Sequence, residues 1–215
     1  MPREAYRWSK RVFDVVAAVI LTIALLPLAV AVAVAIKLTS RGRVIFRQER
    51  IGEGGRTFEM LKFRTMREPR HDEARELTDG KRMTTFGRFL RRASLDELPQ
   101  LWNVIRGDLS LVGPRPLPVK YMPYFTAREQ LRYSVPPGIT GWAQIQGRNE
   151  SGWTARFAND VWYVENRSFM LDICIIWMTV TTVIRKTGLV DDPRSVMLNL
   201  DEERAGLLVR GDAPR

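Results

Sequence analysis

Cysteine and histidine are scarce in this sequence, and their scarcity excludes several kinds of site. Cys174 is the only cysteine, so the chain forms no internal disulfide and a zinc site is not expected. His71 is the only histidine, which leaves almost no material for histidine-based catalysis or a histidine-rich metal site. The low cysteine content fits a reducing compartment. Any chemistry must therefore use other residue types.

Positive charge is abundant. Lysine and arginine total 34, aspartate and glutamate total 24, and the formal net charge is +10 over 215 residues. This excess points to an anionic partner, which is nucleic acid, an anionic membrane surface or a phosphorylated substrate. The length suits one domain, or one domain plus a membrane element, with ample chain for a core. Composition does not choose among the three partners.

A long apolar run dominates the amino-terminal region. Residues 12–36 carry a single charge, Asp14, and would form a helix of about 38 Å, longer than a hydrocarbon core of about 30 Å. Cations flank both ends, so the positive-inside rule is best satisfied when both ends face the cytoplasm. Pro27 removes a helical hydrogen bond near the middle. These features favour a spanning helix and a broken, re-entrant helix about equally, whereas the run is too long for a typical signal peptide.

Two strands are predicted over residues 44–51 and 57–66, joined by a glycine-rich turn over residues 52–55. In the second strand Lys62 and Arg64 share one face, a spacing that suits phosphate binding but also fits a solvated strand face. Residues 67–82 predict a loop or a short surface helix. A helix over residues 83–93 follows, and it brings several arginines to the segment after it.

The stretch from residue 94 to residue 116 carries two adjacent carboxylates, Asp96 and Glu97, among cations. Phosphoryl chemistry needs this mixture, because one acid attacks or positions a metal while cations hold anionic oxygens. The local alternative is a capping box formed by Ser94 and Glu97, with Pro99 in the first turn of a helix. This segment alone favours the capping interpretation, and the rest of the chain reverses that preference. A metal bound here would be Mg²⁺, because its ligands are all oxygens.

The last third contains a proline- and glycine-rich loop and a second apolar run. The loop over residues 136–149 combines an aromatic ring, an amide and a cation, which is typical of nucleotide-binding loops and of structural loops. A short helix is predicted around residues 126–134. Residues 169–184 are too short to span a membrane and predict a buried or interfacial helix. The tail beyond Gly188 is polar, and we expect it to be peripheral.

Taken together, these segments resemble the bacterial polyprenyl-phosphate phosphoglycosyl transferases, which are small monotopic sugar-phosphate transferases. The resemblance covers about residues 10–187, and its specificity comes from the order and spacing of the matching pieces. These pieces are Lys10-Arg11 with Asp14, the apolar run with Pro27, and residues 46–52, 58–66, 94–104, 107–116, 137–144 and 147–149. The short length looks like the minimal form of such an enzyme.

The resemblance implies a two-step reaction on Asp96. This carboxylate would attack the β-phosphorus of a UDP-sugar, expel UMP and form an aspartyl phosphosugar. Polyprenyl (undecaprenyl) phosphate would then displace Asp96, which begins the assembly of a surface glycan or exopolysaccharide. Glu97 matches the family's second catalytic carboxylate, which assists metal binding or proton handling. Mg²⁺ is the implied cofactor, with Asp96 as its ligand.

The resemblance also assigns cations to the substrates. Lys62, Arg91 and Arg115 match the family's positions around the phosphates. Arg148, beside the loop that contains Gly141 and Trp142, is a candidate for nucleotide contact. Arg64 joins the predicted substrate-binding residues through its place beside Lys62. Which sugar is transferred is not readable from these residues.

The implied fold is α+β and mostly helical, with a small β-hairpin, an amino-terminal re-entrant membrane helix and amphipathic interfacial helices. Its parts are a membrane segment over residues 1–40, a cytosolic catalytic domain over 41–190 and a polar tail over 191–215. The family breaks its membrane helix at the position of Pro27, but here Leu26 stands where members often have serine. Serine can bond freed backbone groups, so a milder bend is expected. The implied location is the cytoplasmic face of the bacterial inner membrane.

The expected partners are a UDP-sugar, polyprenyl phosphate and membrane lipids, with no nucleic acid, and a homodimer is left open. The rival interpretation is a membrane-anchored basic binding module or scaffold without catalysis. The net charge fits it, but no nucleic-acid-binding motif is recognisable, and the two carboxylates would have no role. A scaffold would tolerate Asp96→Asn, whereas the enzyme would not.

Overall fold

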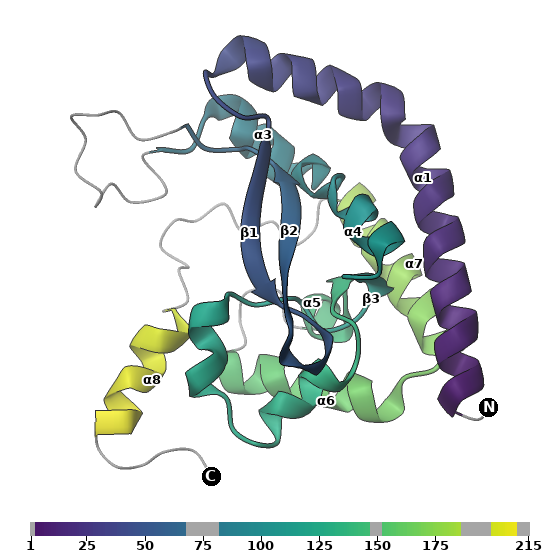
Figure 1. Ribbon diagram of the computed structural model, residues 1–215, viewed down its shortest axis with the longest axis vertical. Coiled ribbons are helices and arrows are strands. Elements are labelled where there is room, and N and C mark those ends of the chain that lie inside the picture. The colour runs from purple at the N-terminus through teal and green to yellow at the C-terminus, as the bar shows by residue number, and fades with distance from the viewer. Residues whose placement is uncertain (1–2, 68–81, 147–151, 186–198, 210–215) are drawn as a thin grey trace.

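Helices surround a short β-hairpin in the computed structural model, which describes residues 3–67, 82–146, 152–185 and 199–209 (Figure 1). The fold is α+β and mostly helical, as predicted. The helices are α1 (Arg3–Thr39), α3 (Thr85–Arg92), α4 (Gln100–Arg106), α5 (Trp142–Gln146), α6 (Trp153–Asn166), α7 (Phe169–Arg185) and α8 (Leu200–Val209). The strands are β1 (Ile45–Ile51), β2 (Thr57–Phe63), β3 (Ser110–Val112) and β4 (Gly138–Thr140). Short 3₁₀ helices are η1 (Glu53–Gly55), η2 (Leu95–Glu97), η3 (Val119–Tyr124) and η4 (Glu129–Ser134). Most of the segment over residues 67–82, with His71, and also Arg148, lie outside the described residues.

Helix α1 contains Pro27 in its interior and bends between its two halves (Figure 1). Its first half packs on α4 through Ala18, which is fully buried. Its second half packs on the end of β2 and on α3 through Val32 and Ile36. Proline removes a donor from the helix and favours a bend. Both halves of α1 therefore contact the rest of the molecule.

The apolar surface of α1 is mostly exposed. Residues Glu4–Thr39 are long and apolar enough to cross a membrane, and only 11% of their most apolar stretch is buried within the protein. Ile23 is 68% exposed and Leu26 is 55% exposed. Helix α7 likewise exposes Trp177 and Met170. Such surfaces are unfavourable in water, and they indicate that the protein associates with a membrane.

The β-hairpin confirms the two predicted strands. Strands β1 and β2 are antiparallel and pair from Ile45 opposite Phe63 to Ile51 opposite Thr57. Gly54 and Gly55 in the connecting turn have φ of 68° and 77°, a conformation that glycine adopts without strain. Helices α3 and α7 also form where the periodicity predicted them. Local pattern was sufficient for these elements.

The segment expected as a loop from residue 136 forms a strand and a helix instead. Strand β4 pairs in parallel with β3, from Ser110 opposite Gly138 to Val112 opposite Thr140. A Cβ atom at Gly138 would clash with the backbone of Gly113, so glycine permits this close approach. Helix α5 follows, and the ring of its first residue, Trp142, stacks on that of Trp162 with centroids 4.7 Å apart. The loop prediction was wrong because the partner strand lies far away in the sequence.

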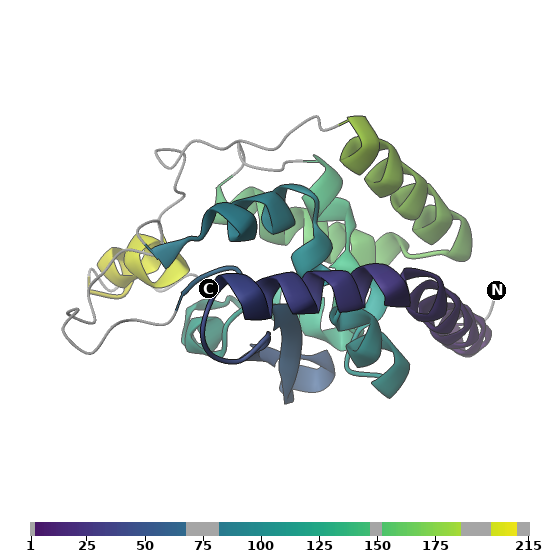
Figure 2. The same ribbon diagram turned by 90° about the horizontal axis from the view of Figure 1, so that it is seen from above.

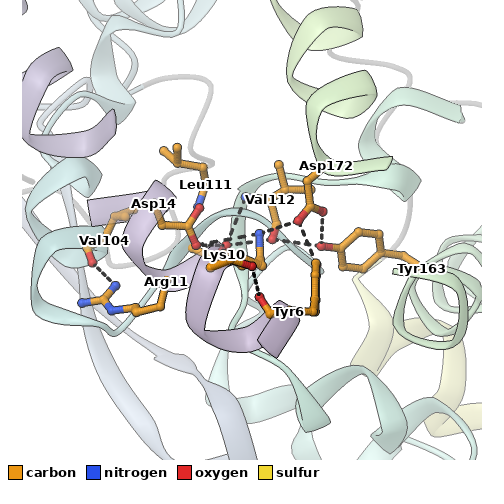
Figure 3. A network of polar contacts seen from close by, with 11 residues as sticks. Tyr6, Lys10, Arg11, Asp14, Val104, Leu111, Val112, Tyr163 and Asp172 are labelled. Carbon is orange, nitrogen blue, oxygen red and sulfur yellow. Dashed lines mark hydrogen bonds and ion pairs between the residues drawn. The ribbon is translucent and has the colours of Figure 1, made fainter. Parts of the chain in front are cut away.

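The amino-terminal half of α1 is joined to α7 and α6 by a buried polar network (Figure 3). The Asp172 carboxylate accepts hydrogen bonds from the hydroxyls of Tyr6 at 2.8 Å and Tyr163 at 2.6 Å. Lys10 lies 3.0 Å from the same carboxylate. Asp172, which interrupts the second apolar run, therefore has a structural partner for each of its oxygens.

The single charge in the first apolar run, Asp14, has a similar explanation. It is 3% exposed and accepts hydrogen bonds from the hydroxyl of Ser110 at 2.7 Å and the backbone N–H of Leu111 at 3.3 Å. Arg11 donates to two carbonyl oxygens in the last turn of α4, where cations compensate the helix dipole (Figure 3). The motif of adjacent basic residues followed by an aspartate thus fixes α1 to β3 and α4.

The carboxyl-terminal tail is less peripheral than expected. Leu200 at the start of α8 is fully buried in a cluster with residues of η3, η4 and α6. Arg204 is buried and donates to both oxygens of Glu129 at 2.7 Å. A buried arginine is tolerable when its charge is paired in this two-pronged geometry. The polar appearance of the tail concealed this contact, because Glu129 lies in a different part of the chain.

Candidate active site

The two adjacent carboxylates lie in the turn between α3 and α4. Ser94 has φ of 54°, in the left-handed region, and its side chain makes no capping hydrogen bond. The capping box that this segment alone favours for Ser94 and Glu97 therefore does not form, and the sequence as a whole had already favoured a site over it. Helix α3, which precedes this turn, is capped at its amino terminus by Thr84, whose hydroxyl accepts from the backbone N–H of Gly87 at 2.8 Å. The turn directs the side chains of Asp96 and Glu97 into different surroundings.

Glu97 is held by two cations. One of its oxygens, Oε1, accepts from Lys62 Nζ at 2.6 Å and from Arg115 Nη2 at 2.8 Å. Burial by itself raises the pKa of Glu97, but Arg115 and Lys62 outweigh it and lower the pKa to about 2. Glu97 is therefore ionised at neutral pH, and it fixes the positions of both cations.

Asp96 has the opposite surroundings. Asp96 is only 7% exposed, yet its carboxylate forms no hydrogen bond or ion pair with any residue that the structure describes. Burial raises the pKa of Asp96, and the charge of Glu97 adds to this effect, whereas Lys62 opposes it. The oxygen lone pairs of Asp96 are thus available to attack an electrophile or to bind a metal.

Three of the predicted phosphate-binding cations converge on this pair. Lys62 and Arg115 contact Glu97 directly. Arg91 donates from Nε to the Thr65 hydroxyl at 3.1 Å, and its charge lowers the pKa of Asp96. Burial, with help from Arg115, lowers the pKa of Lys62. A concentration of positive charge that one glutamate only partly neutralises is suited to a diphosphate.

The other two predicted cations are placed differently. Arg64 donates from Nη2 to the carbonyl oxygen of Ser40 at 3.1 Å and to its hydroxyl at 2.7 Å, just beyond the end of α1. It lines the same cavity, but these two hydrogen bonds hold the residue that follows α1. Arg148 belongs to residues 147–151, which the structure does not describe.

The carboxylates face an open cavity of about 1460 Å³. This volume exceeds that of a typical small-molecule site, which is about 300–1,000 Å³, and it leaves room for two substrates. One part of the lining is apolar and comes from α1, α4 and α7; it includes Leu21, Leu25, Leu101 and Val183. Another part is polar and aromatic and comes from η3, α6 and the residue before α8; it includes Lys120, Tyr121, Trp153 and Asn199. Helices α7 and α8 lie on opposite sides of the molecule (Figures 1 and 2).

Arg50 is a cation of the cavity that the sequence reasoning missed. Its guanidinium donates to Gln48 Oε1 at 2.6 Å and to the carbonyl oxygen of Pro116 at 3.3 Å, while its buried Nε has no hydrogen-bond partner among the described residues. Burial and the nearby Arg115 lower the pKa of Arg50 to about 10, so it remains charged at neutral pH. The only signal in the sequence was its place in the segment of residues 46–52.

A buried ion pair supports the cationic side of the site, and it too was missed. Arg132 donates from Nε and Nη2 to one oxygen of Asp160 at 3.0 and 2.7 Å. The same Nη2 donates to the carbonyl oxygen of Arg115 at 2.8 Å. The backbone of Arg115 is thereby fixed behind the guanidinium that binds Glu97. No local pattern links these three residues, which come from separate elements.

Known proteins are similar to this chain in sequence over most of its length. The family model for "Bacterial sugar transferase" matches residues 5–186. A sugar transferase of Bacillus subtilis, EpsL, whose function is uncharacterised, is 46% identical over 84% of this chain and 89% of its own length. The UDP-glucose:undecaprenyl-phosphate glucose-1-phosphate transferase of Caulobacter vibrioides is 45% identical over 86% of this chain and 73% of its own length. A UDP-N-acetylgalactosamine-undecaprenyl-phosphate N-acetylgalactosaminephosphotransferase of Aeromonas hydrophila is 38% identical over 87% of this chain and 46% of its own length. The chain therefore belongs to the bacterial sugar transferase family.

Proposed function

We propose that this protein transfers a sugar phosphate from a UDP-sugar to undecaprenyl phosphate, through a covalent intermediate on Asp96. The proposal rests on the different surroundings of two adjacent acids. Glu97 is bound by Lys62 and Arg115, while Asp96 is buried in the same cavity without a described partner. The names of relatives support the substrate class, and they differ in the sugar: glucose, galactose or N-acetylgalactosamine.

In the first step an Asp96 oxygen attacks the β-phosphorus of the donor. The bond from this phosphorus to the bridging oxygen breaks, and UMP leaves with the electron pair. In the second step an oxygen of the prenyl phosphate attacks the same phosphorus, and the carboxylate leaves. Lys62, Arg91, Arg115 and Arg50 hold phosphate oxygens and offset the negative charge that accumulates at the phosphorus.

The residues present fit Mg²⁺. Asp96 and the remaining oxygen of Glu97 offer oxygen ligands, which Mg²⁺ prefers. Within the described ranges no three acidic, histidine or cysteine residues are grouped so that they could hold a metal ion, so the protein would supply few ligands and the diphosphate and water would supply the rest. When bound, the ion neutralises part of the diphosphate charge. In this proposal Asp96 and Glu97 would hold the ion.

The experiment that tests this function measures UMP release by the purified protein from a panel of UDP-sugars. Without prenyl phosphate we expect one UMP per protein molecule, because the aspartyl phosphosugar then blocks further turnover. Adding undecaprenyl phosphate should restore continuous turnover, and EDTA should stop both phases. UMP release that requires both substrates together would contradict the covalent intermediate. If no UDP-sugar in the panel gives UMP release, the result would favour the non-catalytic scaffold.

The packing of α1 supports a re-entrant membrane helix. Its first half is fixed by Lys10 and Asp14, and its end is fixed by the bond from Arg64 to Ser40. A helix that crosses the membrane would carry one of its ends away from the domain on the other side. We propose that α1 enters and leaves the cytoplasmic leaflet of the inner membrane, with the catalytic domain in the cytoplasm and the exposed apolar surfaces in lipid.

This topology predicts the labelling of two new cysteines in a Cys174→Ser background. Glu4→Cys and Arg41→Cys stand on the exposed flanks of α1. In intact cells neither should react with a membrane-impermeant maleimide, and after permeabilisation both should react. A cysteine introduced into a known periplasmic protein serves as the positive control. Labelling of one flank alone in intact cells would establish a spanning helix instead.

A further inference from the structure

One residue of the cavity lining comes from outside the part of the chain that matches the family. The family match ends at residue 186, yet Asn199, immediately before α8, lines the cavity. Asn199 is exposed there. The segment that follows is anchored, because Leu200 is fully buried and Arg204 binds Glu129. This wall is thus a fixed part of the site.

The Asn199 side chain is held in a defined orientation. Its Oδ1 accepts from the Tyr121 hydroxyl at 3.2 Å, and its Nδ2 donates to Glu202 Oε1 at 3.0 Å. Glu202 also accepts from the backbone N–H of Asn199, at 3.2 Å. An amide has two N–H groups and two acceptor lone pairs, so one of each remains available to a ligand.

Aromatic rings complete this wall. Tyr121 and Trp153 line the cavity and pack edge to face, with ring centroids 5.6 Å apart. Asp201 binds Lys120 at 2.8 Å and so ties the first turn of α8 to η3. Aromatic surface next to an oriented amide suits a polyhydroxylated ring, which offers both C–H faces and hydroxyl groups.

We infer that Asn199, oriented by Tyr121, reads the hydroxyl pattern of the donor sugar and is a specificity-determining residue. The inference rests on the proposed function. The donors in the names of the Caulobacter and Aeromonas relatives share uridine diphosphate, and the acceptor of both is undecaprenyl phosphate, whereas the sugar differs. The cations within the shared family region are suited to the common phosphate groups. Asn199 lies beyond that region and is suited to the group that varies, with Tyr121 and Trp153 of the shared region beside it.

The test compares kcat/KM for the best UDP-sugar and for its best epimeric competitor, in the full-length protein. Asn199→Ala should lower the ratio of the two values about tenfold, because one polar contact to a hydroxyl is lost. Tyr121→Phe keeps the ring in the core and removes the hydroxyl that binds Asn199, so it should lower the ratio about threefold. Glu203→Ala, an exposed change in the same turn of α8, is the matched control and should leave the ratio unchanged. The inhibition constant of UMP and the KM for undecaprenyl phosphate should stay within about twofold in all variants.

Each other outcome overturns the inference. If kcat/KM falls by the same factor for both UDP-sugars, Asn199 and α8 have a structural role only. If the inhibition constant of UMP rises by the same factor as kcat/KM for the UDP-sugar falls, the wall contacts the uridine and not the sugar. Wild-type protein that turns over no UDP-sugar would remove the proposed function together with the inference. Normal wild-type turnover with an unchanged ratio in both variants would remove the inference alone.

Discussion

Asp96→Asn is expected to abolish UMP release, with a fall in kcat/KM of about 10⁴-fold or more, as found when a covalent nucleophile is removed. Asparagine has nearly the shape of aspartate, so the turn and the surrounding cations should stay in place. Its neutral amide, however, does not provide the anionic oxygen that attacks phosphorus. Both the acceptor-independent burst and continuous turnover should therefore disappear.

Intact-mass measurement separates loss of the nucleophile from loss of fold. Wild-type protein incubated with the donor alone should gain the mass of one sugar phosphate, and the Asp96→Asn protein should gain none. Asp108→Asn is the matched control, because Asp108 bonds to Asn103 and does not line the cavity. Turnover that survives in the Asp96→Asn protein would exclude Asp96 as the nucleophile and would favour the scaffold interpretation.

Glu97→Gln is expected to lower kcat/KM by about 10²- to 10³-fold, the range found when one preorganised electrostatic contact is removed from an active site. The substitution removes the charge that binds Lys62 at 2.6 Å and Arg115 at 2.8 Å. Both cations then lose their fixed positions, and the neighbouring Asp96 carboxylate becomes their closest counter-charge. Ion pairing would occupy the lone pairs that the attack requires. Single-turnover UMP release measures this loss directly.

The pH profile of the same variant gives an independent check of the site. Burial raises the pKa of Asp96 above the usual aspartate range, and activity requires its ionised form, so kcat/KM should fall as pH decreases through this raised pKa. The pKa of about 2 keeps Glu97 charged across the assay range in the wild type. Glu97→Gln removes a like charge, which lowers the pKa of Asp96 and moves the acid limb to lower pH. An acid limb at the same pH in both proteins would assign it to another group.

The sequence by itself determined the elements with strong local patterns and the types of residue that carry the chemistry. The hairpin follows from two short apolar runs and a glycine-rich turn, and α7 follows from a run of apolar residues. The identity of Asp96 and Glu97 as acids among arginines was also visible. What these residues do had to come from resemblance, because a local pattern fits a capping box as well as a site.

Only the tertiary structure decided which acid is bound and which remains available. Glu97 is the bound acid because it contacts Lys62, which lies 35 residues earlier, and Arg115, which lies 18 residues later. A charge-assisted bond to two cations is stronger than a bond to one neutral backbone N–H, so the capping box does not form. A short stretch of sequence around Glu97 does not reveal this outcome, because the cations that bind Glu97 lie outside that stretch.

The same physical reason explains the remaining differences. Arg64 shares a strand face with Lys62 in the sequence pattern, but its guanidinium donates two hydrogen bonds to Ser40, just beyond the end of α1. The parallel pairing of β3 with β4, and the burial of Arg204 against Glu129, likewise join segments that are distant along the chain. Long-range pairing of charges and backbone groups is decided by the complete fold, because buried polar groups take whichever partner the packing places beside them.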